Sequence, residues 1–239
     1  RRRWLEAMRT TTDRSIAPGA PYRALFGAAL PQLPGSQHAG IRRLRQTSFE
    51  RFMTLGFPGP KSESWKYTSI GRLARADFEI APAAKLARAA IEPYLVQEAR
   101  RLVFVNGHFS ADLSDTGSAN NRVIVGSLGQ AMERGDPAVV AALSGSDPDG
   151  AFSALNDAFA TDGSVIRVDD GVALGQPIQL LFVVSVERDR PRLINARNLV
   201  IVGDGAHLDL IESHFMLDPG DSVTNLVNRV VVGKGAKLR

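Results

Sequence analysis

The first hundred residues carry a helical hydrophobic pattern that prolines interrupt. Apolar and small residues recur at spacings of three and four, at Ile41, Leu44, Ser48, Phe52 and Leu55. This spacing is typical of one face of an amphipathic helix. Gly56 follows the pattern as a C-cap, and Pro58 and Pro60 prevent its continuation. Earlier helices must be short, because prolines occur at 18, 21, 31 and 34. A second helix is expected over Ala83–Glu98, bent or restarted at Pro93.

The period changes from helix to strand after Arg101. Leu102–Val105 predicts a strand, Asn106–Gly107 a tight turn, and His108–Phe109 a return strand. Another strand is expected over Arg122–Val125. Helices are expected over Ser127–Arg134, Pro137–Leu143 and Ala151–Ala160.

From Ser164 onward the pattern is strand and turn. The stretch Asn198–Leu208 matches Asn228–Leu238 at seven of eleven positions, thirty residues later. A weaker copy, Ile166–Leu174, lies 34 residues before the first. A strand, a Gly-containing corner and another strand, repeated at this interval, predict a solenoid of stacked β coils. Each coil then buries its apolar face only when the next coil stacks on it.

These patterns predict a mainly β chain with an N-terminal helical region. We expect three parts: a helical region over 1–100, a mixed α/β connecting region over 101–163, and the start of a solenoid core over 164–239. The chain begins at Arg1 and stops just after a repeat corner, which suggests a fragment. The last coil would then be uncapped, and its strand edges would favour self-association.

Composition excludes several classes of protein. The chain has no cysteine, so it can hold neither a disulfide nor a thiolate metal site. It shows no apolar run of membrane-spanning length and no signal core, which predicts a cytoplasmic protein with no membrane partner. The net charge of +4 divides into +10 over residues 1–101 and −6 over 102–239. A basic half raises a nucleic-acid hypothesis, but apart from Arg1–Arg3 and the Arg42–Arg45 cluster the basic residues are dispersed, and a solvated helix face explains that cluster.

Candidate chemistry is sparse, and we predict no catalytic, cofactor-binding or metal-binding residues. Glu212 and His214 share a strand face with Leu208 and Leu210, which places two polar groups beside a buried side. They could be metal ligands or a charged pair, but a third ligand is missing, and strand-end groups that satisfy the backbone are the favoured interpretation.

Three kinds of loop resemble known sites without fulfilling their requirements. Gly56–Ser62 lacks the glycine and amide donors of a phosphate loop. Gly203–Gly205 and Gly233–Gly235 lead into strands and are interpreted as corners. Asp147–Gly150 and Asp169–Gly171 are typical of turns.

The segment Glu63–Thr68 is interpreted as an aromatic anchor. In an extended segment, Trp65 and Tyr67 would point the same way, with Lys66 opposite.

This segment, with three later ones, is similar to a known family. Gly56-Phe-Pro58 followed by Glu63-Ser-Trp-Lys-Tyr-Thr68 resembles a motif of the SufB/SufD family of SUF iron–sulfur cluster assembly proteins, on the SufD rather than the SufB side. Leu102–Gly107 with Leu113–Ser114, Phe152–Phe159 with Asp162–Gly163, and Ala206–His214 resemble further blocks of that family in the same order.

The resemblance implies a right-handed parallel β-helix core and the role of a non-enzymatic scaffold subunit. It also implies pairing with a SufB-like subunit, and with a SufC-like ATPase through a C-terminal helical region beyond Arg239. The full complex would handle the iron–sulfur cluster, and this chain alone would bind no cofactor. The family's cluster-related histidine would also lie beyond Arg239, so no functional residue is transferred.

Two other classes remain as alternatives. A β-solenoid enzyme of the transferase type would show six-residue periodicity, whereas this repeat is about thirty residues long. A basic nucleic-acid-binding module would need aromatic residues among its arginines, and only Trp4 lies near such a cluster.

Overall fold

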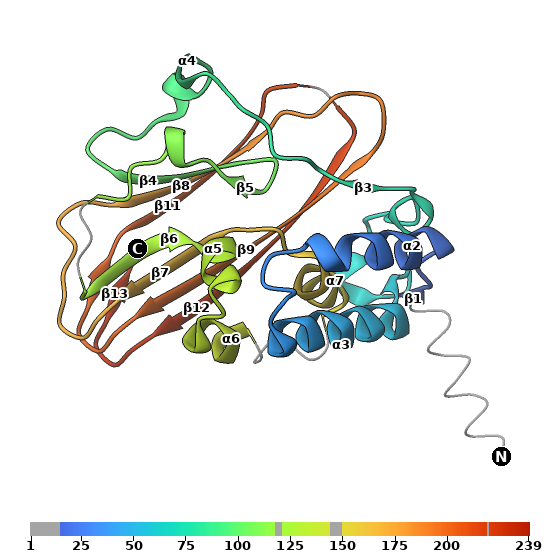
Figure 1. Cartoon of the computed structure of the whole chain (residues 1–239), viewed down its shortest axis with the longest axis horizontal. Coiled ribbons are helices and arrows are strands. Elements are labelled where there is room, and N and C mark those ends of the chain that lie inside the picture. Colours follow the sequence, from blue (N-terminus) through green and yellow to red (C-terminus); the bar gives the residue numbers. More distant parts are fainter. Residues whose placement is uncertain (1–14, 118–120, 144–149, 219) are drawn as a thin grey trace.

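The computed structural model shows two open sheets that face each other, with a layer of helices beside them (Figure 1). It describes residues 15–117, 121–143, 150–218 and 220–239. The notebook of expectations for Arg1–Arg3, Trp4 and the Asp147–Asp149 turn therefore concerns residues outside the described part of the chain.

The N-terminal helices form as the prolines and apolar stripe predict. The elements here are β1 (Ser15–Ile16), α2 (Ala20–Ala29), the 3-10 turn Leu30–Gln32, α3 (Ala39–Leu55) and β2 (Phe57–Pro58). Gly56 ends α3 with φ 66°, and a Cβ there would lie 2.8 Å from the Ile16 carbonyl oxygen. Only glycine satisfies both conditions, so this C-cap prediction is confirmed.

The expected helix over Ala83–Glu98 is wrong in extent. The segment contains the 3-10 turns Glu63–Trp65 and Leu73–Arg75, β3 (Glu79–Ile80), the single turn α4 (Arg88–Ile91) and the 3-10 turn Glu92–Tyr94. Pro93 lacks an amide donor, and Glu98 adopts a positive φ of 54°. Apolar residues of this stretch instead cover the outer face of a sheet, where Tyr94 stacks on Phe215 at 3.8 Å between ring centroids.

The first large sheet has the strand order β11-β8-β4-β5. Its strands are β4 (Arg100–Val105), β5 (His108–Phe109), β8 (Ile178–Val184) and β11 (Leu210–Met216), and the 3-10 turn Ala111–Leu113 follows β5. The β4–β5 hairpin is confirmed, and Asn106 and Gly107 take the positive φ of its turn (53° and 79°). β4 and β11 both pair with β8 in parallel.

The second large sheet has the order β12-β9-β7-β6, and β3 pairs with β9 as well. Its long strands are β6 (Val123–Ser127), β7 (Ser164–Val168), β9 (Arg192–Val202) and β12 (Ser222–Val232). A small third sheet joins β10 (His207–Leu208) to β13 (Lys237–Leu238). All pairs among β7, β9, β10, β12 and β13 are parallel, so successive passages of the chain stack in the same direction.

The sequence repeat coincides with the strand register. Asn198 pairs with Asn228 and Leu208 with Leu238, which is the offset of the two strong copies. The weaker copy also aligns, because Ile166 pairs with Val200. Equivalent residues therefore stack directly on one another, as the solenoid prediction requires.

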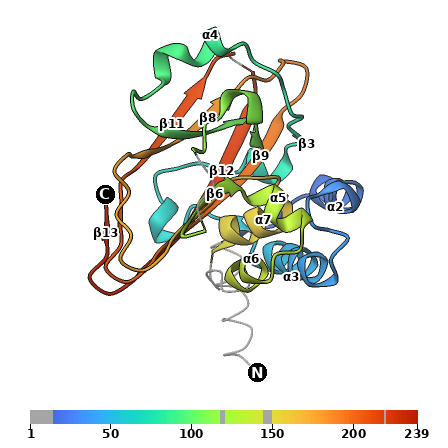
Figure 2. The same ribbon diagram turned by 60° about the vertical axis from the view of Figure 1, so that its left-hand side comes forward.

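Three further helices lie in the middle of the chain: α5 (Leu128–Glu133), α6 (Pro137–Leu143) and α7 (Ala151–Phe159). The Ser127 hydroxyl caps α5 by accepting a bond from the Gln130 amide at 3.0 Å. α7 lies between α2 and α3 on one side and the second sheet on the other (Figures 1 and 2). All three helices are close to their predicted positions.

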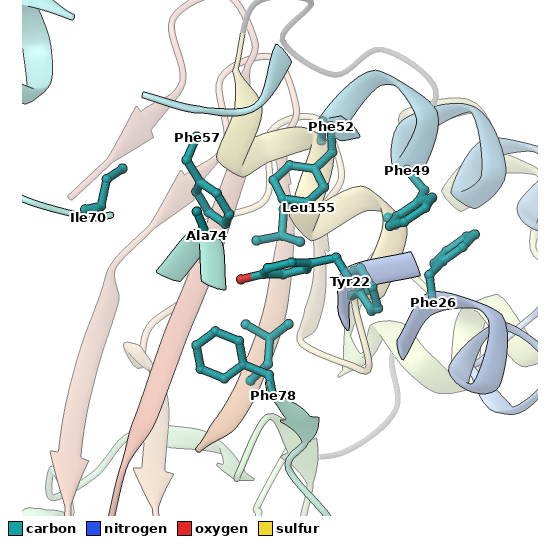
Figure 3. Close-up of a cluster of buried hydrophobic side chains, with 13 residues drawn as sticks. Tyr22, Phe26, Phe49, Phe52, Phe57, Ile70, Ala74, Phe78 and Leu155 are labelled. Carbon is teal, nitrogen blue, oxygen red and sulfur yellow. The ribbon is translucent and has the colours of Figure 1, made fainter. Parts of the chain in front are cut away.

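Two large hydrophobic cores result. The helical core joins aromatic residues of α2, α3 and α7 with the irregular segment, and Tyr22 lies near its centre (Figure 3). The inter-sheet core lies between the two large sheets. Its residues include Leu102, Phe104, Ile166, Val168, Leu180, Phe182, Ala196, Val200 and Val202.

Candidate functional site

The candidate site is the part of the inter-sheet core where polar residues replace apolar ones. In the parallel register, Glu212 follows Leu102 and Leu180 at one position. His214 follows Phe104 and Phe182 at the next. Glu212 and His214 thus occupy positions that earlier passages fill with core side chains, which confirms the expected placement beside a buried side.

The His214 ring continues a column of stacked rings. Phe104 and Phe182 stack with centroids 4.9 Å apart, and His214 stacks on Phe182 at 5.0 Å with an interplanar angle of 10°. The His214 side chain remains 46% exposed, because it lies on the edge strand of its sheet. The ring is therefore held in place on one face and open to solvent elsewhere.

A chain of hydrogen bonds connects this histidine to the opposite sheet. The Ser164 amide and hydroxyl both donate to Asn198 Oδ1 at 2.9 Å. Asn198 Nδ2 donates to Asn228 Oδ1 at 2.7 Å. Asn228 Nδ2 then donates to Glu212 Oε2 at 2.9 Å, and His214 Nε2 lies 2.8 Å from Glu212 Oε1. These residues form a continuous polar row, named here the Ser164–His214 row. The favoured strand-end interpretation is thus wrong for Glu212 and His214, because they bond to each other and to asparagines of β9 and β12 and not to backbone groups.

Edge strands surround this row. Beside it, β12 exposes Val230, Val231 and Val232, each between 45% and 48% exposed, and β11 exposes Met216. The repeat corners lie at the same end, where the Asp204 carboxylate accepts a bond from the Lys234 amide at 2.7 Å. The Asp170 carboxylate accepts the equivalent bond from the Asp204 amide at 2.8 Å. The corner interpretation of these glycine-containing turns is confirmed, since Gly171, Gly205 and Gly235 all adopt positive φ.

A second polar centre, Asp162, was not predicted from the sequence as more than part of a motif. Its carboxylate accepts bonds from the Phe109, Gly129 and Gly163 amides and from the Ser127 hydroxyl, at 2.8 to 3.0 Å. Burial raises the pKa of Asp162, and these four donors oppose that rise. The residue joins β5, α5 and β7, which makes it a structural hub.

The arginine cluster Arg42–Arg45 is only partly a solvated face. Arg42 and Arg43 are exposed, but Arg45 is fully buried and donates to the carbonyl oxygens of Pro34, Ala158 and Ala160. Burial lowers the pKa of Arg45 to about 10. Nearby, Arg197 of β9 forms a buried ion pair with Asp157 of α7. Helix α3 therefore uses one of its arginines to bind the ends of other elements, not nucleic acid.

Comparison with known proteins identifies the family. A family model described as the SufBD protein N-terminal region matches residues 19–180. The chain belongs to the SufBD family. This confirms the family that the four sequence blocks indicate.

Two curated relatives agree with the SufBD assignment. The chain is 28% identical over 216 residues to the "iron-sulfur cluster assembly SufBD family protein slr0076" of Synechocystis sp., covering 85% of this chain and 47% of the relative. It is 22% identical over 204 residues to "Protein ABCI7, chloroplastic" of Arabidopsis thaliana, covering 83% of this chain and 43% of the relative. The chain spans about half the length of these relatives.

The SufBD motif at Glu63–Thr68 is only partly the anchor that was expected. Trp65 stacks on Phe152 of α7 at 4.9 Å, as an anchor should. Tyr67, however, is 91% exposed and not packed beside Trp65. The prediction of a shared direction is wrong because Glu63–Trp65 is a 3-10 turn and not an extended segment.

Two searches of the described SufBD chain gave negative results. Among the residues that the structure describes, no group of three or more histidine and acidic side chains could hold a metal ion. Within the same ranges, no helix is long and apolar enough to cross a membrane.

Proposed function

We propose that the chain is part of a non-catalytic scaffold subunit of the SUF iron–sulfur cluster assembly machinery, on the SufD side of the family. The observation that carries the proposal is the match of residues 19–180 to the SufBD N-terminal region. The relative from Synechocystis, whose name contains iron–sulfur cluster assembly, supports the same process. We place the protein in the cytoplasm, as its sequence predicts.

The stacked strands support the architectural part of the proposal. Passages of the chain pair in parallel at offsets of 30 and 34 residues across three sheets. We propose that they are coils of a right-handed parallel β-helix. Such a stack offers long strand edges and regular faces, which suit a subunit that holds partners.

The proposed partners are a SufB-like subunit and a SufC-like ATPase. The resemblance assigns the SufC contact to a C-terminal helical region, and the described elements after Phe159 are all strands. The SufB-like contact belongs to the β-helix. We therefore expect this chain to bind the SufB-like subunit without retaining the ATPase.

Co-expression tests this proposal. A tagged SufB-like subunit should retain the chain on an affinity column and through gel filtration, and a tagged SufC-like ATPase alone should not. An unrelated tagged β-solenoid protein is the control for general edge-strand association. Elution of the chain apart from the SufB-like subunit would contradict the scaffold role.

The two alternative functions have less support. A transferase-type solenoid would need six-residue coils, whereas the observed offsets are 30 and 34 residues. A nucleic-acid module would need an open basic surface, and Arg45 and Arg197 of the helical side are buried.

A further inference from the structure

The polar residues of β11 interrupt an otherwise apolar core. Leu102 and Leu180 precede Glu212, and Phe104 and Phe182 precede His214 in the stacked register. A leucine and a phenylalanine would continue the inter-sheet core without the cost of placing a carboxylate and an imidazole beside it. Local departures of this kind are typical of binding sites.

The direction of the Ser164–His214 row fixes the tautomer of the histidine. The Ser164 backbone amide is an unambiguous donor, so the atom of Asn198 that faces it is the acceptor Oδ1. Asn198 therefore presents its NH2 group to Asn228, and Asn228 presents its own NH2 group to Glu212. Glu212 is a carboxylate that only accepts, so His214 Nε2 carries the hydrogen in their 2.8 Å contact. In the neutral ring, Nδ1 then holds a lone pair.

This is the arrangement of a metal-binding histidine. Such residues donate one ring N–H to a carboxylate, which orients the ring and increases the basicity of the other nitrogen. The stacked Phe182 holds the His214 plane, and the side chain is open enough for a hydrated ion to reach it.

We propose that His214 Nδ1 is a ligand for a divalent transition-metal ion, with Glu212 as its positioning residue. The ion belongs to the class that imidazole prefers, including Fe²⁺, Co²⁺, Ni²⁺ and Zn²⁺. Water completes its coordination, and one protein ligand suits brief binding and release. The assignment of iron as the natural ion rests on the proposed function, whereas the ligand geometry does not.

His207 provides an internal control. It has the same spacing to a carboxylate, with Nε2 at 3.3 Å from Asp209. The Asp209 carboxylate, however, is held by the Arg239 guanidinium through two bonds of 2.8 and 2.9 Å. The two pairs differ in their surroundings and not in sequence spacing, so a comparison of them isolates the effect of the row.

Paramagnetic NMR with Co²⁺ tests the proposal on the whole chain. The chain has four histidines, so their ring resonances can be assigned with single variants. Submillimolar Co²⁺ should shift or broaden the His214 signals before those of the other three. His214→Phe, which continues the Phe104–Phe182 column, should fold and should lose this response at least tenfold. His207→Gln should retain it, and Glu212→Gln should weaken it about tenfold.

Three results would overturn the proposal: no response of His214 up to about millimolar Co²⁺, an equal response of all four histidines, or unchanged binding in a folded His214→Phe variant. Retention by the SufB-like subunit is measured separately. A chain that binds this subunit without binding Co²⁺ would disprove only the metal site, and one that binds Co²⁺ alone would disprove only the scaffold role.

Discussion

Close backbone approaches determine which single residues the chain requires. Gly163 has φ 146°, and a Cβ at this position would lie 1.8 Å from the Arg197 carbonyl oxygen. Asp162 beside it gathers donors from three elements. The family block that ends in Asp162–Gly163 is therefore explained by backbone packing and carboxylate bonding, not by catalysis.

Gly163→Ala should be strongly destabilising. The added methyl group would collide with backbone that cannot move as a flexible side chain does, and we expect a loss of about 3 kcal/mol or more in the free energy of unfolding. Gly175→Ala is the matched control, since a Cβ at Gly175 has no neighbour within 4 Å. Urea denaturation of both variants measures the difference, and equal stabilities would contradict the close approach.

Asp162 should make stability depend on pH in the acid range. Burial raises its folded-state pKa above the model value of 3.8, so the folded state holds the proton more tightly than the unfolded state. Its contribution is then fully present below pH 3.8 and decreases as the pH rises through the folded pKa. Asp162→Asn should remove this decrease from unfolding free energies measured across pH 3–7. Ser127→Ala, which removes one donor but no titrating group, should lower stability while retaining the decrease; a wild-type profile in Asp162→Asn would contradict the assignment.

At the scale of elements, the sequence predicts what local periodicity controls. The stripe of α3, the β4–β5 turn and the positions of α5, α6 and α7 are all visible in it. The failures are tertiary in origin. Residues 83–98 lie against a sheet that their own pattern does not reveal, and Arg45 is buried by carbonyl groups from distant segments.

The anchor segment separates two neighbouring aromatic residues. Trp65→Ala should cost about 2 kcal/mol, because the indole packs against Phe152 of the helical core. Tyr67→Ala should cost less than about 0.5 kcal/mol, because the phenol ring is almost fully exposed. Thermal unfolding compares the two variants. A larger loss from Tyr67→Ala would show that this ring is packed.

The stacked strands allow the same substitution in two environments. Val200 is 1% exposed and its register partner Val230 is 45% exposed. Val200→Lys should unfold the chain, since it buries an ammonium group without a partner, whereas Val230→Lys should cost less than about 1 kcal/mol and reduce self-association. Melting curves with light scattering measure both effects. Similar melting temperatures would mean that the β12 edge is covered. Val231, which the solenoid interpretation would pair with Val200 as core-facing, instead aligns with Ile201 on the other face.

The whole molecule joins a helical layer to a stack of parallel strands. The thirty-residue repeat predicts this stack well, because equivalent residues align in the register. The polar row could not be predicted beyond Glu212 and His214, since Ser164, Asn198 and Asn228 meet only after the sheets face each other. The division of the chain at residues 100 and 163 stays a prediction, although β4 shares a sheet with β8 and β11.

The chain alone should hold no iron–sulfur cluster. It has no cysteine, and one imidazole cannot replace the thiolates that such clusters require. Anaerobic reconstitution followed by visible absorption should show no stoichiometric cluster on the purified polypeptide. Stable absorbance at one cluster per chain would contradict this expectation and the non-catalytic scaffold proposal would need a different ligand set.

The repeat corners give the stack a direction in time. The carboxylate of Asp170 serves the amide of Asp204, and the carboxylate of Asp204 serves the amide of Lys234. Each corner thus receives its acceptor from the corner that is synthesised before it. A ribosome that releases the chain from its N-terminus supplies the template before the segment that needs it, so the order of translation is also the order in which the corners close.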